Sequence, residues 1–260
     1  MTEGSQFVQL RRWNIFASIL HFVSGIVMLS VSTDLKVPIT SSFLRFNQAT
    51  QSLAPELGEL FSVKLGPLVA SFLIMSALAH LVISLPGINQ WYNNNLKNHI
   101  NIARWIEYAF SSSVMIVVIS MLVGIYDLAT LIVVFFLNAT MILFGWMMEL
   151  HNHALRQDQG KQQTNWTAFI FGCIAGIGPW IAITLYLVSP GTADNPPTFV
   201  YWIFVSLFVF FNIFAINQYL QYRKIGRWSD YLYGERAYIV LSFVAKSLLA
   251  WQVFAGTLRP

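Results

Sequence analysis

Seven stretches of almost uninterrupted apolar sequence, each near 20 residues long, constrain this chain more than any other feature. About 20 helical residues, rising 1.5 Å each, span the roughly 30 Å hydrocarbon core of a bilayer. Only 10% of the 260 residues are charged and 56% are hydrophobic, which is unusual for a soluble domain. The predicted spans are Trp13 to Thr33, Lys64 to Leu85, Ala103 to Ile125, Leu128 to Met148, Trp166 to Val188, Phe199 to Tyr222 and Arg236 to Thr257.

We therefore expect an all-α membrane protein with seven transmembrane helices in a single domain, residues 1–260. The break between the third and fourth spans, Gly124 to Asp127, is short. A count of six helices is possible, but it would leave an implausibly long third span. No internal repeat is evident, which favours one domain.

The basic residues predict how the helices are oriented. Ten lie on the face that carries the N-terminus and four on the other face, and Lys246 within the last span completes the 15. The positive-inside rule then places the N-terminus in the cytoplasm and the C-terminus outside the cell. The ten are Arg11, Arg12, Lys97, Arg104, Arg156, Lys161, Arg223, Lys224, Arg227 and Arg236, and the four are Lys36, Arg45, Lys64 and Arg259. They form no aromatic-interleaved patch, so nucleic acid is not an expected partner.

The longest loop, Asp34 to Val63, separates the first two spans on the predicted extracellular side. Its Leu35, Val37 and Ile39 alternate with polar residues, a pattern typical of a strand. We expect a small pair of extracellular strands, although an irregular cap fits one short alternating run equally well.

Lys246 lies alone in the middle of the last apolar run. A charged lysine there costs roughly 2.5–3.5 kcal/mol on insertion scales, so it needs a counter-charge or a chemical modification such as a Schiff base with an aldehyde. Glu107 is the only acidic residue well within an apolar segment, since Asp127 and Glu149 mark helix ends and the others lie in loops. Glu107 is therefore the predicted partner of Lys246. The alternative is a pair between Arg104 and Glu107 at i,i+3.

Other polar residues lie within the spans. His21 and His80 fall in the same half of the bundle as Glu107, and Ser76 shares the helix face of His80. Imidazoles titrate near neutral pH, so these groups could form a hydrated proton-accepting cluster. Each histidine taken alone is better explained as an ordinary hydrogen-bonded interior residue, and the depth that both share with Glu107 favours the cluster.

Further residues could surround a long apolar ligand near Lys246. Ser242 faces the same way as Lys246 at i−4, Ser111 shares the face of Glu107, and Asn138 needs a polar partner at mid-membrane depth. A slot for such a ligand could be lined by Met115, Met141, Gly145, Phe208 and Phe211. Plain helix packing is the alternative for all of these apolar positions, and also for the serine run that includes Ser112.

The chain resembles the heliorhodopsins, microbial retinal proteins with a lysine in the last of seven helices. The resemblance covers nearly the whole chain. It rests on Arg104 to Tyr108 (RWIEY) followed by Ser111 to Met115, on Asn138 to Trp146 (NATMILFGW), on Phe171 to Pro179 (FGCIAGIGP) and on Gly234 to Ser247 (GERAYIVLSFVAKS). The inverted topology of that family agrees with the orientation predicted from the basic residues.

The resemblance implies that Lys246 binds all-trans retinal as a protonated Schiff base and that Glu107 is its counterion. It matches His21 and His80 to two histidines in the cytoplasmic half of the family's bundle, and Ser242 to a serine one turn before the lysine. With Ser76, placed beside His80 by its helix face, the two histidines form the predicted proton-accepting cluster. Together with the positions inferred above from residue type and helix face, the predicted retinal site also includes Tyr108, Ser111, Ser112, Met115, Asn138, Met141, Gly145, Phe208 and Phe211.

The resemblance also implies a function. Outward proton pumps among the related rhodopsins carry carboxylates where this chain has Ser242 and Val118, so we expect a light sensor with a slow photocycle that signals to a cytoplasmic partner. A light-gated or light-driven ion transporter is the alternative, followed by a light-independent transporter. Neither an enzyme nor a metal site is expected, because no nucleophile–base set or metal-ligand spacing is present. A homodimer is expected from the family, with the extracellular loop as a possible interface.

Overall fold

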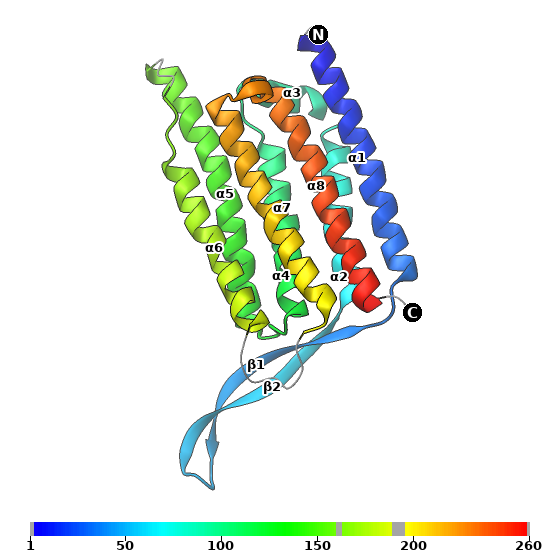
Figure 1. The fold of residues 1–260 in the computed structure, drawn as a ribbon, viewed down its shortest axis with the longest axis vertical. Helices are drawn as coiled ribbons and strands as arrows, with labels where there is room; N and C mark the ends of the chain where they lie inside the picture. Colours follow the sequence, from blue (N-terminus) through cyan, green and yellow to red (C-terminus); the bar gives the residue numbers. More distant parts are fainter. Residues whose placement is uncertain (1–2, 160–162, 189–195, 259–260) are drawn as a thin grey trace.

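The computed structural model describes residues 3–159, 163–188 and 196–258. Lys161 and Arg259, which were counted in the predicted orientation, lie outside these ranges. The described chain forms a bundle of helices from which one long β-hairpin projects (Figure 1). The N-terminus lies at one end of the bundle, and the C-terminus lies at the other end, beside the base of the hairpin (Figure 1). We call these the N-terminal end and the hairpin end.

Within the described residues, seven helices are long and apolar enough to cross a membrane, which confirms the predicted number. Asn101 and Asp230 cap two of them by accepting hydrogen bonds from the backbone N–H groups of Arg104 and Leu232. The seven helices are α1 (Glu3–Val31), α2 (Leu65–Val82), α4 (Ile102–Leu122), α5 (Leu128–Gln159), α6 (Thr167–Leu187), α7 (Thr198–Arg223) and α8 (Tyr231–Val253).

Two features of the N-terminal end differ from the sequence prediction. Helix α5 continues past Met148 to Gln159, because the polar side chains that follow, including Glu149 and Asn152, are buried within the bundle. A further helix, α3 (Ile88–Lys97), fills the connection between α2 and α4. It is polar overall and buries Tyr92 and Leu96, so hydropathy alone does not reveal it.

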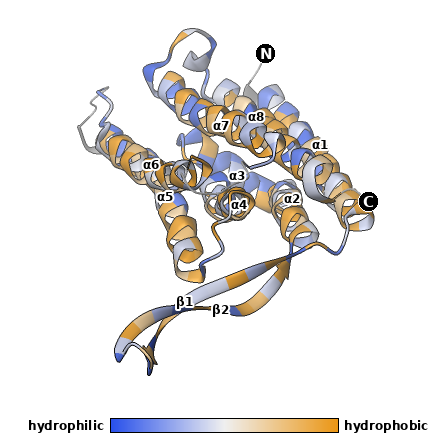
Figure 2. Ribbon diagram, turned by 60° about the horizontal axis from the view of Figure 1, so that its bottom comes forward, coloured by the Kyte–Doolittle hydropathy of each residue, from blue (hydrophilic) through white to orange (hydrophobic). Residues whose placement is uncertain are grey.

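The helices form two layers, as the view in Figure 2 shows. Helices α1, α8 and α7 lie in one layer, and α2, α4 and α5 lie in the other, with α6 packed against α5. Among the seven spans, α4 has the largest buried share. The main core packs α2, α4 and α8 together through residues such as Phe72, Ile116, Ile119 and Leu249. This arrangement turns one face of α4 toward α8.

The hairpin confirms the predicted strand pair and is longer than the alternating run suggested. Strand β1 (Lys36–Asn47) pairs with β2 (Ser52–Lys64) in antiparallel register, from Lys36 opposite Lys64 to Asn47 opposite Ser52. At its base Ile39 is buried, and the Thr40 N–H donates to the Tyr126 carbonyl at 2.9 Å. The strands extend beyond the alternating run because their backbone hydrogen bonds continue along the hairpin. These hydrogen bonds do not depend on side-chain alternation, so the sequence pattern does not show where they end.

Candidate functional site

The site forms where α8 faces α2 and α4, around the side chain of Lys246. Lys246 is 3% exposed. Its Nζ donates to Glu107 Oε1 at 2.7 Å and to Ser76 Oγ at 2.5 Å, and the Ser76 hydroxyl donates to the same Glu107 oxygen at 2.6 Å. The three side chains therefore form a closed triangle in which a carboxylate neutralises the buried ammonium.

This triangle contains the Lys246–Glu107 pair that the sequence predicts. The alternative pair between Arg104 and Glu107 is wrong, because the Arg104 guanidinium contacts Glu149 and Glu235 instead. Helix α4 begins at Ile102, so Glu107 lies deep enough along it to meet a lysine from the middle of α8.

The two predicted histidines lie beside this triangle. His21 of α1 is fully buried and stacks on His80 of α2, with ring centroids 5.9 Å apart and planes 9° apart. His80 Nδ1 lies 2.8 Å from Asn14 Oδ1, while neither ring nitrogen of His21 has a hydrogen-bond partner among the described residues. Ser76, one turn from His80 on α2, links this histidine pair to the triangle.

A small polar cavity joins the histidine region to Glu107. It leaves about 30 Å³ accessible to the centre of a water molecule, which is room for about two waters when each needs roughly 10–15 Å³. Asn14, His80, Glu107 and Tyr108 are among the residues that line it. Water at this place would have several polar partners.

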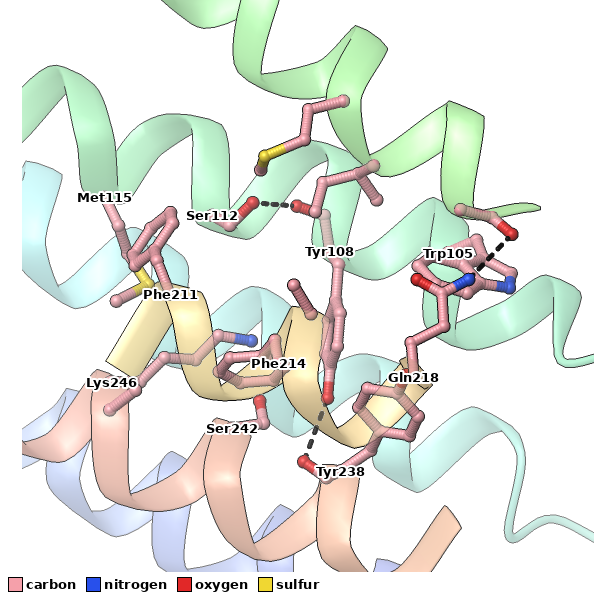
Figure 3. A pocket seen from close by; sticks show the side chains of 15 residues that line it. Trp105, Tyr108, Ser112, Met115, Phe211, Phe214, Gln218, Tyr238, Ser242 and Lys246 are labelled. Atoms are coloured by element: carbon pink, nitrogen blue, oxygen red, sulfur yellow. Dashed lines mark hydrogen bonds between the residues drawn. The ribbon is translucent and has the colours of Figure 1, made fainter. Parts of the chain in front are cut away.

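A second, mostly apolar cavity lies on the other side of Lys246 (Figure 3). It leaves about 100 Å³ accessible to the centre of a water molecule, several times the volume that a single water needs. The Lys246 side chain reaches into it, and its Nζ lies 5.1 Å from the centre of the Tyr108 ring. The lining consists of Trp105, Tyr108, Ser112, Met115, Met141, Ile142, Gly145, Phe211, Phe214, Ala215, Gln218, Tyr238, Ser242, Ala245 and Lys246.

Most of the residues predicted around the ligand are brought together here. Tyr108, Ser112, Met115, Met141, Gly145, Phe211, Ser242 and Lys246 all line the cavity. Asn138 is buried behind it, and its Nδ2 donates to the hydroxyls of Ser112 and Ser113 at 2.9 and 3.0 Å. Ser111 is also fully buried and is not part of the lining.

Phe208 was predicted to line the same cavity, and the structure places it elsewhere. Its side chain is 42% exposed, and its ring packs against Trp180 at a centroid distance of 5.2 Å. Phe208 shares a helix face with Phe211 but lies one turn closer to the hairpin end. The cavity does not extend that far, because Trp180 also packs on Phe211 at 5.5 Å.

The prediction missed seven lining residues, and the four with large side chains among them follow helical periodicity. The other three, Ile142, Ala215 and Ala245, each neighbour another lining residue in the sequence. On α4, Trp105 precedes Tyr108 by three residues, and on α7, Phe214 and Gln218 follow Phe211 by three and seven. Tyr238 lies one turn before Ser242 on α8. Extending each predicted face by one turn toward the N-terminal end would have found Trp105, Phe214 and Tyr238, and a second turn on α7 would have found Gln218.

Gly145 on α5 allows the wall of the cavity to close tightly. A Cβ added at this position would collide with the six-membered ring of Trp105. A larger residue would therefore push the indole from its place against Gly145. The Gln218 amide also reaches toward the Gly145 carbonyl, at 3.5 Å, so two side chains pack over one glycine.

A second buried ion cluster closes the N-terminal end of the site. The Arg104 guanidinium contacts Glu149 Oε1 at 2.5 Å through one nitrogen and a Glu235 oxygen through the other. Asn101 binds both carboxylates, through its N–H to Glu149 at 2.8 Å and its amide to Glu235 at 2.6 Å. The guanidinium carbon lies 3.9 Å from the centre of the Tyr238 ring.

This cluster corrects the sequence prediction for two acids. Glu149 was taken as a helix end and Glu235 as a loop residue, yet both lie within helices and are 1% exposed. Both are beyond the predicted apolar spans, where the helices continue in polar sequence.

The comparisons with known proteins agree with this geometry. A family model described as Heliorhodopsin matches residues 10–258. The chain belongs to the heliorhodopsin family. The match covers nearly the whole chain and confirms the resemblance seen in the sequence. With seven apolar helices, membership of this family makes the protein a multi-pass membrane protein.

The fold of this heliorhodopsin-family chain is rhodopsin-like. It is similar to a crystal structure of a light-driven proton pump, LR (Mac), from Leptosphaeria maculans, with a TM-score of 0.63 and 14% sequence identity, over 95% of this chain and 94% of that chain. At that identity the similarity shows the fold alone. No curated protein matches the sequence.

Family and fold together imply a retinal chromophore. The residues around Lys246 fit such a group: a buried primary amine can condense with an aldehyde, a carboxylate lies beside it, and the cavity that it enters is lined mainly by aromatic and aliphatic side chains. The absence of a side chain at Gly145 leaves room for the Trp105 ring at the wall of this cavity.

Proposed function

We propose that the protein is a light sensor that carries all-trans retinal on Lys246 as a protonated Schiff base, with Glu107 as the counterion. The observation that carries this proposal is the position of the Lys246 amine. It is buried against Glu107 and Ser76 on one side and opens on an apolar cavity on the other. Retinal bound at this amine would supply the absorption of visible light and a bond that isomerises.

The chain's own residues would hold the charge and exclude water. Glu107 stabilises a positive charge on the Lys246 nitrogen, and Ser76 orients the carboxylate by donating to the oxygen that accepts from Lys246. Tyr108, Phe211 and Phe214 surround the cavity with aromatic rings. Ser242 adds a hydroxyl near the nitrogen, and the buried Asn138 fixes the Ser112 hydroxyl at the wall.

A proton released from the Lys246 nitrogen would move toward the N-terminal end. Glu107 is the first acceptor within hydrogen-bond distance, at 2.7 Å. His80 and His21 are the next groups, and the small polar cavity that His80 and Glu107 share has room for bridging water. We therefore propose His21, His80 and Ser76 as the proton-accepting cluster, since imidazole takes up protons near neutral pH.

Signalling is favoured over pumping by the distribution of carboxylates. A pump needs proton-binding groups on both sides of the Lys246 nitrogen. Within the described spans, Glu107, Glu149 and Glu235 all lie toward the N-terminal end, and the positions expected to carry acids in pumps hold Ser242 and Val118. A photoreceptor of this kind is not an enzyme.

The orientation, the domain organisation and the partners belong to the same proposal. We propose one domain over residues 1–260, with its N-terminus in the cytoplasm, supported by the ten basic residues of that face. The signalling partner would then bind at the N-terminal end. A homodimer through the hairpin is supported by the exposed apolar side chains of the hairpin, which include Phe43, Leu44 and Leu57.

The absorption spectrum of the purified protein, reconstituted with all-trans retinal, tests the chromophore. We expect a visible band for the wild type and none for Lys246→Ala. Lys224→Ala, which removes a lysine from the end of α7, is the matched control and should keep the band. A colourless wild type would favour a light-independent transporter built on the Lys246–Glu107 pair.

A pH electrode in a suspension of illuminated cells separates a sensor from a pump. We expect no sustained light-dependent change of external pH. A sustained change that a protonophore abolishes would contradict the sensor and establish ion transport.

A further inference from the structure

A wide polar cavity opens at the N-terminal end, away from Lys246. It leaves about 590 Å³ accessible to the centre of a water molecule. The connection after α3, the end of α5, the approach to α6, the end of α7 and the turn before α8 all contribute side chains. The lining residues are His99, Asn152, Arg156, Gln163, Thr164, Trp166, Gln221, Tyr222, Arg223, Lys224, Trp228, Ser229 and Tyr231.

The described lining of this cavity carries positive charge without negative charge. Arg156, Arg223 and Lys224 contribute three cations, and none of the described lining residues is acidic. Burial lowers the pKa of His99 first, and the nearby charges of Arg156 and Lys224 lower it further. Two of the cations therefore lie close to one lining residue, although they come from different helices.

Arg223 stacks on Trp166 and Tyr219, but within the described residues the Arg156 and Lys224 side chains lack the hydrogen-bond and ion-pair partners that Arg11 and Arg236 of the same end possess. Arg11 donates to the Ser84 carbonyl, and Arg236 pairs with Asp230. Within the described residues, the side chains of Arg156 and Lys224 make no ion pair and no hydrogen bond. The positive-inside rule accounts for basic residues at this end, but it does not account for their convergence on one hollow.

The floor of the cavity holds further unused polar atoms. Gln221 is 6% exposed, and its Oε1 has no hydrogen-bond partner among the described residues, nor does the buried hydroxyl of Tyr231. Buried polar atoms are normally satisfied, so an acceptor and a hydroxyl left open here indicate a ligand or ordered water. Trp166 and Trp228 add flat apolar surface beside them.

We propose that this cavity binds a phosphate-bearing small molecule or headgroup that also carries O–H or N–H donors. A phosphate ester carries a charge of about −1.5 to −2 at neutral pH and presents three acceptor oxygens, which matches several converging cations better than a single carboxylate would. The donors on the ligand would satisfy Gln221 Oε1. The source is either a soluble phosphate metabolite or a phospholipid headgroup.

The position of Gln221 gives this site a route to the buried cluster. Its Nε2 donates to Glu235 Oε1 at 3.2 Å and to the Tyr231 carbonyl at 3.0 Å, and Glu235 contacts Arg104. A ligand on Gln221 would thus be one side chain away from the ion cluster above the Lys246 cavity. The proposal does not depend on the retinal chemistry, because the residues that line this wide polar cavity and those that line the Lys246 cavity do not overlap.

The soluble source is tested by isothermal calorimetry, in which sodium pyrophosphate or AMP is titrated into the protein in phosphatidylcholine nanodiscs. The lipid source is tested by native mass spectrometry of protein taken from mixed phosphatidylglycerol and phosphatidylcholine vesicles. We expect one probe class to bind the wild type. The double variant Arg156→Gln with Lys224→Gln should bind it at least tenfold more weakly, and the control Arg12→Gln with Arg227→Gln should bind it unchanged.

A second pair of variants keeps the test informative if the double variant does not fold. Ser229 is exposed at the rim, and Ser229→Glu places a negative charge in the cavity, whereas Ser229→Gln is its neutral match. Binding should fall for Ser229→Glu and persist for Ser229→Gln. The proposal is overturned if the wild type binds neither probe class, or if the control variants lose as much affinity as the cavity variants.

Discussion

The described part of the protein contains two buried ion clusters close together, and their chemistry differs. In the first, Lys246 meets a single carboxylate, Glu107, and faces an open cavity. In the second, Arg104 meets two carboxylates and stacks on Tyr238. Lysine can lose its proton and react as an amine, whereas arginine stays protonated and presents a rigid fork. The first cluster can do chemistry, and the second can only hold helices together.

The difference lies in the number of carboxylates that hold each cation. The Arg104 guanidinium binds a carboxylate through each terminal nitrogen, and Asn101 completes both carboxylates. Lys246 has two hydrogen-bond partners, Ser76 and Glu107, and lines the mostly apolar cavity. A buried primary amine beside an apolar cavity can react with a ligand, whereas a guanidinium held between two carboxylates fixes the helices that carry them.

Exchanging the two cation types should give the largest effect. Lys246→Arg keeps the charge but removes the primary amine, so the visible band should disappear completely. Arg104→Lys should keep the band, because its amine lies on the far side of Trp105 and Tyr238 and lines only the small polar cavity. Absorption spectra after reconstitution with all-trans retinal measure both. A band in Lys246→Arg would show that the chromophore is bound elsewhere.

Removing the structural cation should cost the most stability. Arg104→Met leaves Glu149 and Glu235 buried without a counter-charge, and breaking such a pair costs roughly 3–5 kcal/mol. Lys246→Met leaves only Glu107, so we expect a smaller loss. Unfolding of the retinal-free proteins in detergent compares the two.

Adding Glu149→Gln and Glu235→Gln to Arg104→Met should restore part of the lost stability, because the repulsion between carboxylates is removed. Equal losses for Arg104→Met and Lys246→Met would remove the distinction between the clusters.

The colour of the protein should distinguish the carboxylates. Glu107→Gln should move the absorption maximum to longer wavelength, because the positive charge at the Lys246 nitrogen is no longer localised by its counterion. Glu149→Gln should move it much less, since Glu149 contacts Arg104 and not Lys246. Similar shifts in both variants would mean that the two clusters act electrostatically as one.

An exposed pair at the base of the hairpin should show the smallest effect. Lys64 Nζ donates to Asp34 at 2.6 Å, and this hydrogen bond lowers the pKa of the Asp34 carboxyl below its ordinary range. The stabilising contribution is therefore present above an ordinary aspartate pKa of about 4 and is lost as the pH falls through the lowered value. Melting temperatures of wild type and Asp34→Asn should differ slightly at pH ~6 and converge at pH ~2. A large difference in melting temperature at pH ~6 would contradict the expectation that solvent exposure weakens the Lys64–Asp34 pair.

The sequence predicts the reactive cluster well because it is an exception to a strong rule. Membrane spans exclude charge, so Lys246 and Glu107 stand out in apolar sequence and have few possible partners. The number of spans follows for the same reason. Hydropathy also places Ser242 and His80 within spans, and helical periodicity gives their faces.

The structural cluster could not be predicted in the same way. Glu149 and Glu235 lie where the helices continue beyond the apolar runs, so they resemble ordinary interfacial residues. Their burial depends on Arg104 and Asn101, which are distant in sequence from both and carry no local sign of the contact. Helix α3 was missed because it is held by tertiary packing of Tyr92 and Leu96 and not by its own hydropathy.

The base of the hairpin is hydrogen-bonded to the chain at two places, one beside α4 and one beside α8. Thr40 is hydrogen-bonded to Tyr126, in the connection between α4 and α5, and Thr33, just before β1, is hydrogen-bonded to Leu258, just after α8. Twelve paired residues, at about 3.3 Å each, carry its tip roughly 40 Å from that base. The base of the hairpin is thus hydrogen-bonded beside the ends of α4 and α8, the two helices that bear Glu107 and Lys246. A tilt of about 3° at the base of a strand pair this long, at about 3.3 Å per residue, would move its tip by about 2 Å. A small movement at the ends of these helices would therefore be larger at the tip of the hairpin.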